Sequence, residues 1–167
     1  VYLVHCPQLY ARDSLYTNAV DEHLRFFLFQ LAILESCQRL RFAPDVMHCN
    51  DWHTGLLPQL LRTRYAWDSL FARTRTLLTI HNIGYQGDYA GPFLYEQGIA
   101  PRMDPRLWNG SKDNNLMAIG VNYADFVTTV SPRYAVEIQY PENGYGLEGL
   151  VRARGTDMRG ILNGIDM

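Results

Sequence analysis

Polar side chains able to make hydrogen bonds follow four separate, largely apolar runs of this sequence. They are Asn50, Asp51 and His53 after the run 46–49, His81 and Asn82 after 76–80, Ser131 after 126–130, and Asn163 with Gly164 after 158–162. In an open sheet of parallel strands, ligands bind beyond the carboxyl ends of the strands. If the runs are such strands, these side chains meet on one rim and form a single polar site.

Each of these residues also has a structural explanation. Asp51 is equally well explained as the cap of a turn or helix and as a functional carboxylate, whereas His53 is better explained by packing or capping than by reaction. Asn163-Gly164, taken alone, is a common tight-turn pair. His81 ends an apolar run just before a glycine-rich loop, so we expect its imidazole to point into a cleft.

Several other chemistries are not supported. The sequence has no G-x-S-x-G nucleophile elbow and no G-x-x-x-x-G-K-[ST] phosphate loop. Residues 144–149 match G-x-G-x-x-G by letter, but they do not follow a strand, so we treat the match as chance. His48, Asp51 and His53 lie close in sequence, yet His48 falls within a strand and no H-E-x-x-H helix is present, so no metal site is predicted.

The sequence predicts that helices and strands alternate along the chain. An apolar face at helical spacing runs from Val20 to Cys37, with Asn18 as the expected N-cap and an end before Pro44. Further helices are predicted over 55–64, capped by Thr54, over 113–123, and from 131 onward. Strands are predicted over 1–4, 45–49, 75–80, 125–130 and 158–162. Residues 83–110 are rich in glycine and proline, and we expect them to form a long loop or lid with a function.

This alternation predicts right-handed βαβ units, a mostly parallel sheet and therefore an α/β fold. The strands 46–49, 76–80 and 126–130 are apolar on both faces, so we expect helices to cover both sides of the sheet. With 167 residues, 47% of them hydrophobic, the chain suits about one domain with its own core.

Charge and cysteine content exclude several classes of protein. Fifteen basic and 17 acidic residues leave a net charge of −2, which gives no general attraction to nucleic acid or to anionic membranes. The richest apolar stretch, residues 26–34, is far shorter than the roughly 18 residues of a membrane span. Cys6, Cys37 and Cys49 are odd in number and widely spaced, so a disulfide framework is not expected. Both ends look cut, and we interpret the chain as an internal fragment.

Five motifs occur in order along the chain: the Asp-Trp-His segment in residues 44–58, the His-Asn-x-x-Tyr-Gln-Gly segment in 79–87, and residues 128–132, 144–150 and 161–166. Together they resemble the bacterial glycogen synthases and plant starch synthases. The resemblance covers essentially the whole chain. It implies a retaining glycosyltransferase with two facing Rossmann-like domains (the GT-B arrangement). The chain would be most of the N-terminal, acceptor-side domain, residues 1–167, without its first strands.

The resemblance also implies roles for individual residues. His81 would contact the transferred glucose near the reacting centre, and Asn163, next to Gly164, would bind the same sugar. Asp51 and Tyr16 would line the sugar and acceptor side, although Tyr16 alone would be a surface tyrosine. The loop around the sugar would be shaped by Asn82, Tyr85 and Gln86.

The implied substrates are ADP-glucose as donor and an α-1,4-glucan as acceptor, with no metal or other cofactor. The location would be the cytoplasm of a bacterium, or a plastid in a plant. The family's Lys-x-Gly-Gly-Leu segment and its C-terminal nucleotide-binding domain are not in this sequence. We therefore expect the 167 residues alone to be inactive and only marginally stable. Alternatives are a glycosyltransferase that uses a UDP-sugar and a catalytically silent glucan-binding module.

Overall fold

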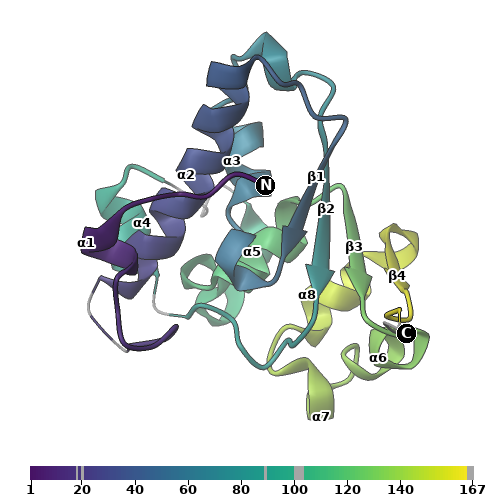
Figure 1. Cartoon of the computed structure of the whole chain (residues 1–167). Coiled ribbons are helices and arrows are strands. Elements are labelled where there is room, and N and C mark those ends of the chain that lie inside the picture. The colour runs from purple at the N-terminus through teal and green to yellow at the C-terminus, as the bar shows by residue number, and fades with distance from the viewer. Residues whose placement is uncertain (18, 20, 89, 100–103, 165–167) are drawn as a thin grey trace.

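A parallel four-stranded sheet organises the computed structural model, which describes residues 1–164 apart from 18, 20, 89 and 100–103. The strands are β1 (Val46–Asn50), β2 (Arg75–Ile80), β3 (Phe126–Thr129) and β4 (Met158–Gly160). They lie in the order β1-β2-β3-β4, and every neighbouring pair is parallel. All four strands therefore end at the same edge, the lower edge in Figure 1. The predicted α/β fold with a parallel sheet is confirmed.

The helices connect or precede these strands. They are α1 (Pro7–Tyr10), α2 (Glu22–Leu40), α3 (Leu57–Arg62), α4 (Gly91–Glu96), α5 (Leu116–Tyr123), α6 (Pro132–Glu137), α7 (Pro141–Gly144) and α8 (Glu148–Ala153), with a 3-10 turn, η1 (Trp52–Thr54), directly after β1. The predicted long loop 83–110 thus contains a short helix, α4. No helix in the described ranges is long and apolar enough to cross a membrane.

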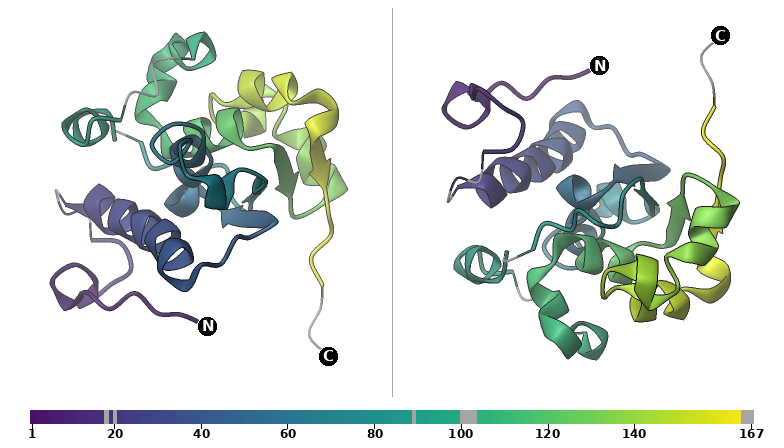
Figure 2. Two further views of the ribbon diagram at one scale, coloured as in Figure 1. Left: turned by 90° about the horizontal axis from the view of Figure 1, so that it is seen from above. Right: turned by 90° about the horizontal axis from the view of Figure 1, so that it is seen from below.

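Helix α5 is the centre of the core. Seven of its eight residues, from Leu116 to Asn122, are buried. It packs against η1 and α3, where a Cβ on Gly120 would lie 2.9 Å from the Cα of Gly55. Because neither residue has a side chain, the two backbones approach closely, and the loop after β1 is held firmly on the core. Figure 2 shows α3, α5 and α8 on one side of the sheet.

The opposite side of the sheet is largely uncovered in the described structure. Along β1 the side chains alternate between exposed and buried: Met47 and Cys49 are buried under the helices, whereas Val46 is 56% exposed and His48 is exposed as well. The expectation that helices cover both faces is therefore wrong for the described residues. The physical reason is topological, since right-handed crossovers that always step in one direction place every connecting helix on the same face.

The N-terminal residues are not a strand, contrary to the prediction for 1–4. Val1, Tyr2 and Leu3 are strongly exposed and pair with no strand. Helix α2 confirms the predicted long helix, and its described boundaries are set by Asp21 and Arg41. Arg41 adopts a left-handed conformation with φ +51° and ends the helix before Pro44 is reached. The predicted cap Asn18 and the first face residue, Val20, lie outside the described residues.

Two predicted helix caps have different outcomes. Ser131 caps α6 as predicted, because its hydroxyl accepts a hydrogen bond from the Tyr134 amide at 3.0 Å. Thr54 does not cap a helix: its hydroxyl donates to the Asn50 carbonyl at 2.9 Å and accepts from the Asn50 amide at 2.6 Å. Thr54 therefore closes the turn after β1, and α3 begins only at Leu57.

Candidate active site

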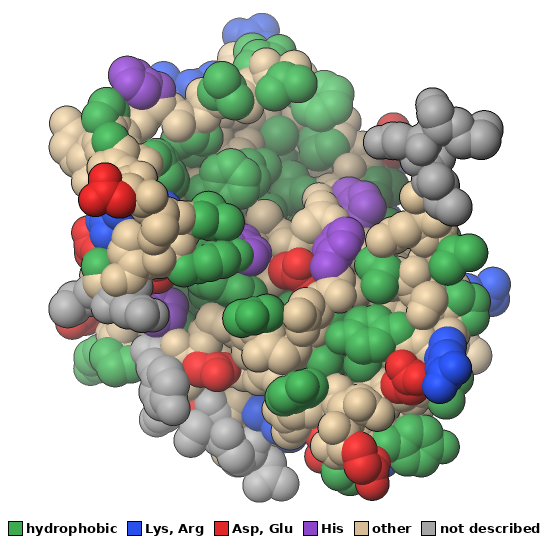
Figure 3. Space-filling view, turned by 60° about the horizontal axis from the view of Figure 1, so that its bottom comes forward, with side chains coloured by type: hydrophobic (Ala, Val, Ile, Leu, Met, Phe, Trp, Pro, Cys, Tyr) green, Lys and Arg blue, Asp and Glu red, His purple; other side chains and the backbone are tan. Residues whose placement is uncertain are grey.

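Polar residues from β1 and β2 meet at the carboxyl edge of the sheet, as the alternation of elements predicts. Figure 3 turns this edge toward the viewer and shows histidine side chains and an acidic side chain around a hollow in the middle of the face. Neighbouring parallel strands bring together residues that lie about thirty positions apart in the sequence. Hydrogen bonds between the ends of β1 and β2 join these residues.

Asp51 ties the end of β1 to the end of β2. Its Oδ1 accepts hydrogen bonds from the backbone amides of His81, at 2.8 Å, and Asn82, at 3.3 Å, while its own amide donates to the Thr79 carbonyl at 2.9 Å. Asp51 has φ +52° and ψ −170°, a conformation that residues other than glycine rarely adopt. Such backbone strain concentrates at functional sites, and here it turns the carboxylate toward the start of the loop after β2.

The imidazole of His81 is fixed by a neighbour from β1. His81 Nε2 lies 2.9 Å from Oδ1 of Asn50, and both side chains are exposed at the edge. Because an amide oxygen can only accept, Nε2 of His81 carries a proton and donates it in this contact. The sequence placed Asn50 on this rim but did not predict that it orients His81.

The loop after β2 is shaped by its own polar side chains. Asn82 Oδ1 accepts from the Gly84 amide at 2.9 Å, and the Ile83 amide donates to the Tyr134 hydroxyl at 3.0 Å. Gln86 is buried, and its Nε2 donates to the Ile83 carbonyl at 2.9 Å. Asn82 and Gln86 therefore hold the loop in shape, whereas Tyr85, 68% exposed, presents its ring at the surface of that loop.

A second anchor fixes the far side of this loop. The Nδ2 of Asn115, just before α5, donates to Oε1 of Gln86 at 2.5 Å and to Oδ1 of Asp88 at 2.8 Å. Gly87 has φ +64°, and a Cβ there would lie 2.5 Å from the Trp52 ring. The loop thus rests directly on the segment after β1. Asn115 is a supporting residue that no sequence pattern indicated, since only the fold brings it to Gln86.

Tyr16 reaches the site from the segment before α2. Its hydroxyl lies 2.8 Å from Nε2 of His53, and the two rings are stacked with centroids 5.7 Å apart. Burial raises the pKa of Tyr16, and the negative charge of Asp51 adds to the effect. Burial also lowers the pKa of His53, against the opposing influence of Asp51 and Glu22. His53 therefore packs, as predicted, but it also makes a polar contact at the rim.

Asn163 and Gly164 are not joined to the other site residues in the described structure. Both are exposed, and they follow β4 in an extended segment whose Ile161 amide still donates to the Thr129 carbonyl at 2.8 Å. Their strand ends at the same edge as the others, which places the pair on the correct side of the sheet. No hydrogen bond among the described residues connects Asn163 to His81 or Asp51.

Other chemistries find no support in the described residues. No group of three or more His, Cys, Asp or Glu side chains in these ranges is arranged to hold a metal ion. His48 contacts the Thr79 hydroxyl at 2.7 Å on the sheet face. The three cysteines are free, and burial raises the pKa of the Cys49 thiol to about 12, which keeps it protonated. Residues 144–149 run from the last residue of α7 into the start of α8 and do not follow a strand, as predicted.

The parallel sheet defines an α/β protein, and its polar carboxyl edge is the place where proteins of this class bind ligands. Comparison with known proteins makes this more specific: the model of the starch synthase catalytic domain family matches residues 1–153. The chain belongs to that family.

Individual relatives agree with this assignment. Over 170 residues the chain is 40% identical to a glycogen synthase of Aeromonas salmonicida, and over 171 residues it is 42% identical to glycogen synthase 2 of Geobacter sulfurreducens. Each match covers 99% of this chain and 35% of the relative, so the chain spans about a third of the curated relatives' length. The solved catalytic domain of starch synthase IV from Arabidopsis thaliana, bound to ADP and acarbose, is similar with a TM-score of 0.83 at 33% identity. That match covers 93% of this chain and 32% of the starch synthase chain.

Proposed function

We propose that this chain is the acceptor-side part of a two-domain, retaining glucosyltransferase that extends an α-1,4-glucan. In this proposal the donor is ADP-glucose, and the glucose is added at the non-reducing end of glycogen or starch. The observation that carries the proposal is the contact of Asp51 with the backbone of His81 and Asn82 at the carboxyl edge of the sheet. The names of the relatives, and the ADP and acarbose bound to the Arabidopsis enzyme, support it.

The uncovered face of the sheet supports the proposal that the working protein is longer. Parallel sheets occur almost only with both faces covered, because their strands are apolar on both sides. Here Val46 is exposed and Leu77 only half-buried. We assign the missing cover to further residues of the N-terminal domain, and the binding of the nucleotide to a C-terminal domain outside this chain.

The roles that we assign to the site residues rest on the contacts of Asp51 and His81 and, for Asn163, Tyr16 and Tyr85, on the family resemblance. Glycosyl transfer passes through an oxocarbenium-like state, so fixed groups must stabilise charge on the sugar and the leaving group. We assign His81 and Asn163 to hydrogen bonds with hydroxyls of the transferred glucose. Because the Asp51 carboxylate already accepts two backbone amides, we assign it to orienting His81 and not to attack on the sugar. Tyr16 and Tyr85 would receive the acceptor glucan.

The protein needs no metal or other cofactor in this scheme. The bacterial relatives favour the cytoplasm as its location. The leaving diphosphate would be stabilised by basic residues of the C-terminal domain.

The experiment that tests this function uses the complete protein that contains the chain. It is supplied with glycogen and either ADP-glucose or UDP-glucose, and incorporation of glucose into glycogen is followed. We expect incorporation from ADP-glucose. Incorporation from UDP-glucose alone would show that the donor is UDP-glucose and not ADP-glucose. Binding of glycogen without incorporation from either donor would indicate a catalytically silent binding module.

A further inference from the structure

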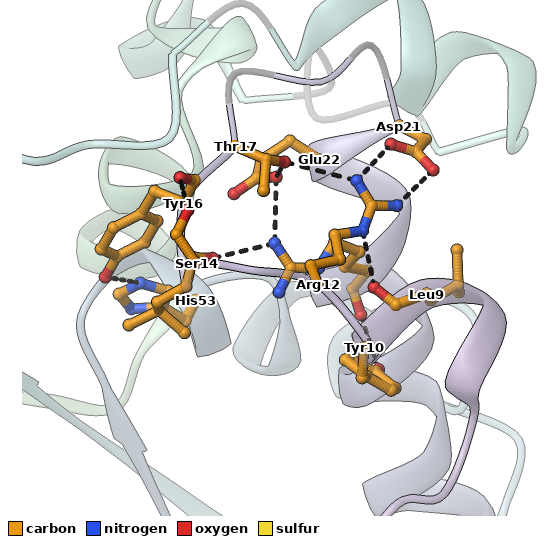
Figure 4. A network of polar contacts seen from close by, with 11 residues as sticks. Leu9, Tyr10, Arg12, Ser14, Tyr16, Thr17, Asp21, Glu22 and His53 are labelled. Carbon is orange, nitrogen blue, oxygen red and sulfur yellow. Dashed lines mark hydrogen bonds and ion pairs between the residues drawn. The ribbon is translucent and has the colours of Figure 1, made fainter.

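The contact between Tyr16 and His53 joins two segments that are 37 residues apart in the sequence. The Tyr16 ring, 50% exposed, lies at the rim of the site and is stacked on the His53 ring with an interplanar angle of 29°. Figure 4 shows the hydroxyl of Tyr16 directed at the His53 imidazole. The hydroxyl end of Tyr16 is thus held by His53, while half of the residue stays accessible.

His53 is itself held in place by aromatic neighbours. Its ring stacks on Trp52 with a centroid separation of 4.2 Å, and the edge-to-face contact with Phe26 of α2 is 4.8 Å. Phe26 and Trp52 are buried in the core. The position of His53 is therefore fixed by the core. A side chain that is hydrogen-bonded to His53 is restrained by it in turn.

The backbone around Tyr16 is anchored separately from its side chain. Arg25, buried in α2, donates to the Leu15 carbonyl at 2.8 Å, and Arg12 donates to Oδ1 of Asp21 at 2.9 Å (Figure 4). These contacts hold the segment against α2, but they leave the direction of the Tyr16 ring undetermined. In the described structure that direction is set by the hydrogen bond to His53 and by the Trp52 ring, whose centroid lies 6.3 Å from that of Tyr16.

The charged groups that face His53 are Asp51, at the end of β1, and Glu22, at the start of α2. Both favour the protonated imidazole, yet burial outweighs them and lowers its pKa. Burial therefore favours the neutral ring, which can share one proton with the Tyr16 hydroxyl without placing a positive charge at the rim.

We propose that His53 is a positioning residue that holds the Tyr16 ring and hydroxyl in the orientation that receives the glucan acceptor. This inference rests on the proposed function, because it takes the glucan as the ligand of Tyr16. An aromatic ring with a polar tip suits a sugar, which presents both C–H faces and hydroxyls. Fixing the ring before the glucan arrives reduces the entropy lost on binding.

The test measures binding of maltoheptaose to the complete protein by calorimetry, for His53→Ala, Tyr16→Ala and the double variant. Loss of the hydrogen bond and of the stacked support should weaken binding about 3- to 10-fold in His53→Ala. In the Tyr16→Ala background the same change should have almost no further effect, because the positioned side chain is already gone. His53→Gln, which retains a hydrogen-bonding group, should recover part of the affinity.

Tyr10→Phe is a matched control, since it removes a tyrosine hydroxyl that donates to the Arg25 carbonyl at 2.8 Å but does not touch His53. It should leave maltoheptaose binding unchanged. In transfer assays, His53→Ala should raise KM for glucan and leave KM for ADP-glucose unchanged.

The inference is overturned if the wild-type protein does not bind maltoheptaose, or if His53→Ala weakens binding equally with and without Tyr16. A different result would contradict the proposed function alone. Maltoheptaose would bind, and His53→Ala would weaken binding only when Tyr16 is present, but no glucose would be transferred from either donor.

Discussion

At the scale of single residues, the site depends on a few side chains whose hydrogen bonds fix the backbone of the neighbouring strand end. Asp51 accepts the amides of His81 and Asn82 from a strained backbone conformation with φ +52°. Its position after an apolar strand was enough to single it out in the sequence. The sequence could not show the strain or the two amide contacts, because both depend on the register between β1 and β2.

A pair of substitutions separates strain from hydrogen bonding at Asp51. Asp51→Ala and Asp51→Gly both remove the carboxylate, so both should lose most of the transferase activity of the complete protein. Asp51→Gly relieves the positive φ and should be more stable than Asp51→Ala by about 1–2 kcal/mol. Thermal unfolding of the two variants checks this, and equal unfolding midpoints would show that the backbone is not strained.

His53 predicts a pH dependence of stability. Burial lowers its pKa in the folded state below the unfolded value of about 6.5. The folded state therefore binds fewer protons than the unfolded chain, so this contribution to stability is complete above about pH 6.5 and decreases as the pH falls toward the folded-state pKa. Unfolding midpoints between pH 5 and 8 should show a shallower slope in His53→Gln than in the wild type. Parallel curves would contradict the prediction.

At the scale of elements, periodicity predicted the strands and helices more accurately than their packing. Strand 75–80 has its predicted boundaries, and the Ser131-Pro132 helix start is confirmed. Thr54 was wrongly taken as a cap, because its hydroxyl bonds to Asn50 across a turn. The close approach of Gly55 and Gly120 left no signal in the sequence, since it depends on how η1 packs against α5.

That approach predicts unequal effects for two glycine substitutions in helices. In Gly120→Ala the new Cβ would lie 2.9 Å from Gly55 backbone atoms, so the packing of η1 on α5 should be disturbed at a cost of about 1–3 kcal/mol. Gly149→Ala in α8 is the control, because nothing lies within 4 Å of its Cβ, and helix propensity should make it neutral or slightly stabilising. Gly120→Ala should lower the unfolding midpoint, whereas Gly149→Ala should leave it unchanged or raise it slightly. A Gly120→Ala variant as stable as the wild type would contradict the described packing.

At the scale of the whole molecule, one face of the sheet is covered and the other is largely open. The open face carries both apolar and polar side chains, such as Val46 and His48 on β1, so the need for cover on this face stays a prediction. Only the strand order shows that the helices connecting the described strands cover one face of the sheet. The resemblance of five ordered motifs identified the family, which the match over residues 1–153 confirms.

The open face predicts how the 167-residue chain behaves by itself. We expect it to unfold at a lower temperature than the complete protein, to bind a dye specific for exposed apolar surface, and to transfer no glucose. Differential scanning calorimetry, dye fluorescence and the incorporation assay test these points. A reversible, cooperative transition like that of the complete protein, or detectable glucan synthesis by the chain alone, would disprove this expectation.

The most direct test of the proposed site is the turnover of the complete protein with ADP-glucose and glycogen when His81 is replaced by alanine. His81→Ala should lower kcat by about 10²–10³-fold, as loss of one group that stabilises the transition state does, with a small change in KM for glycogen. His5→Ala, which removes an exposed imidazole before α1, should behave as the wild type. A His81→Ala enzyme with unchanged kcat would place the chemistry elsewhere and contradict the site described at the carboxyl edge of the sheet.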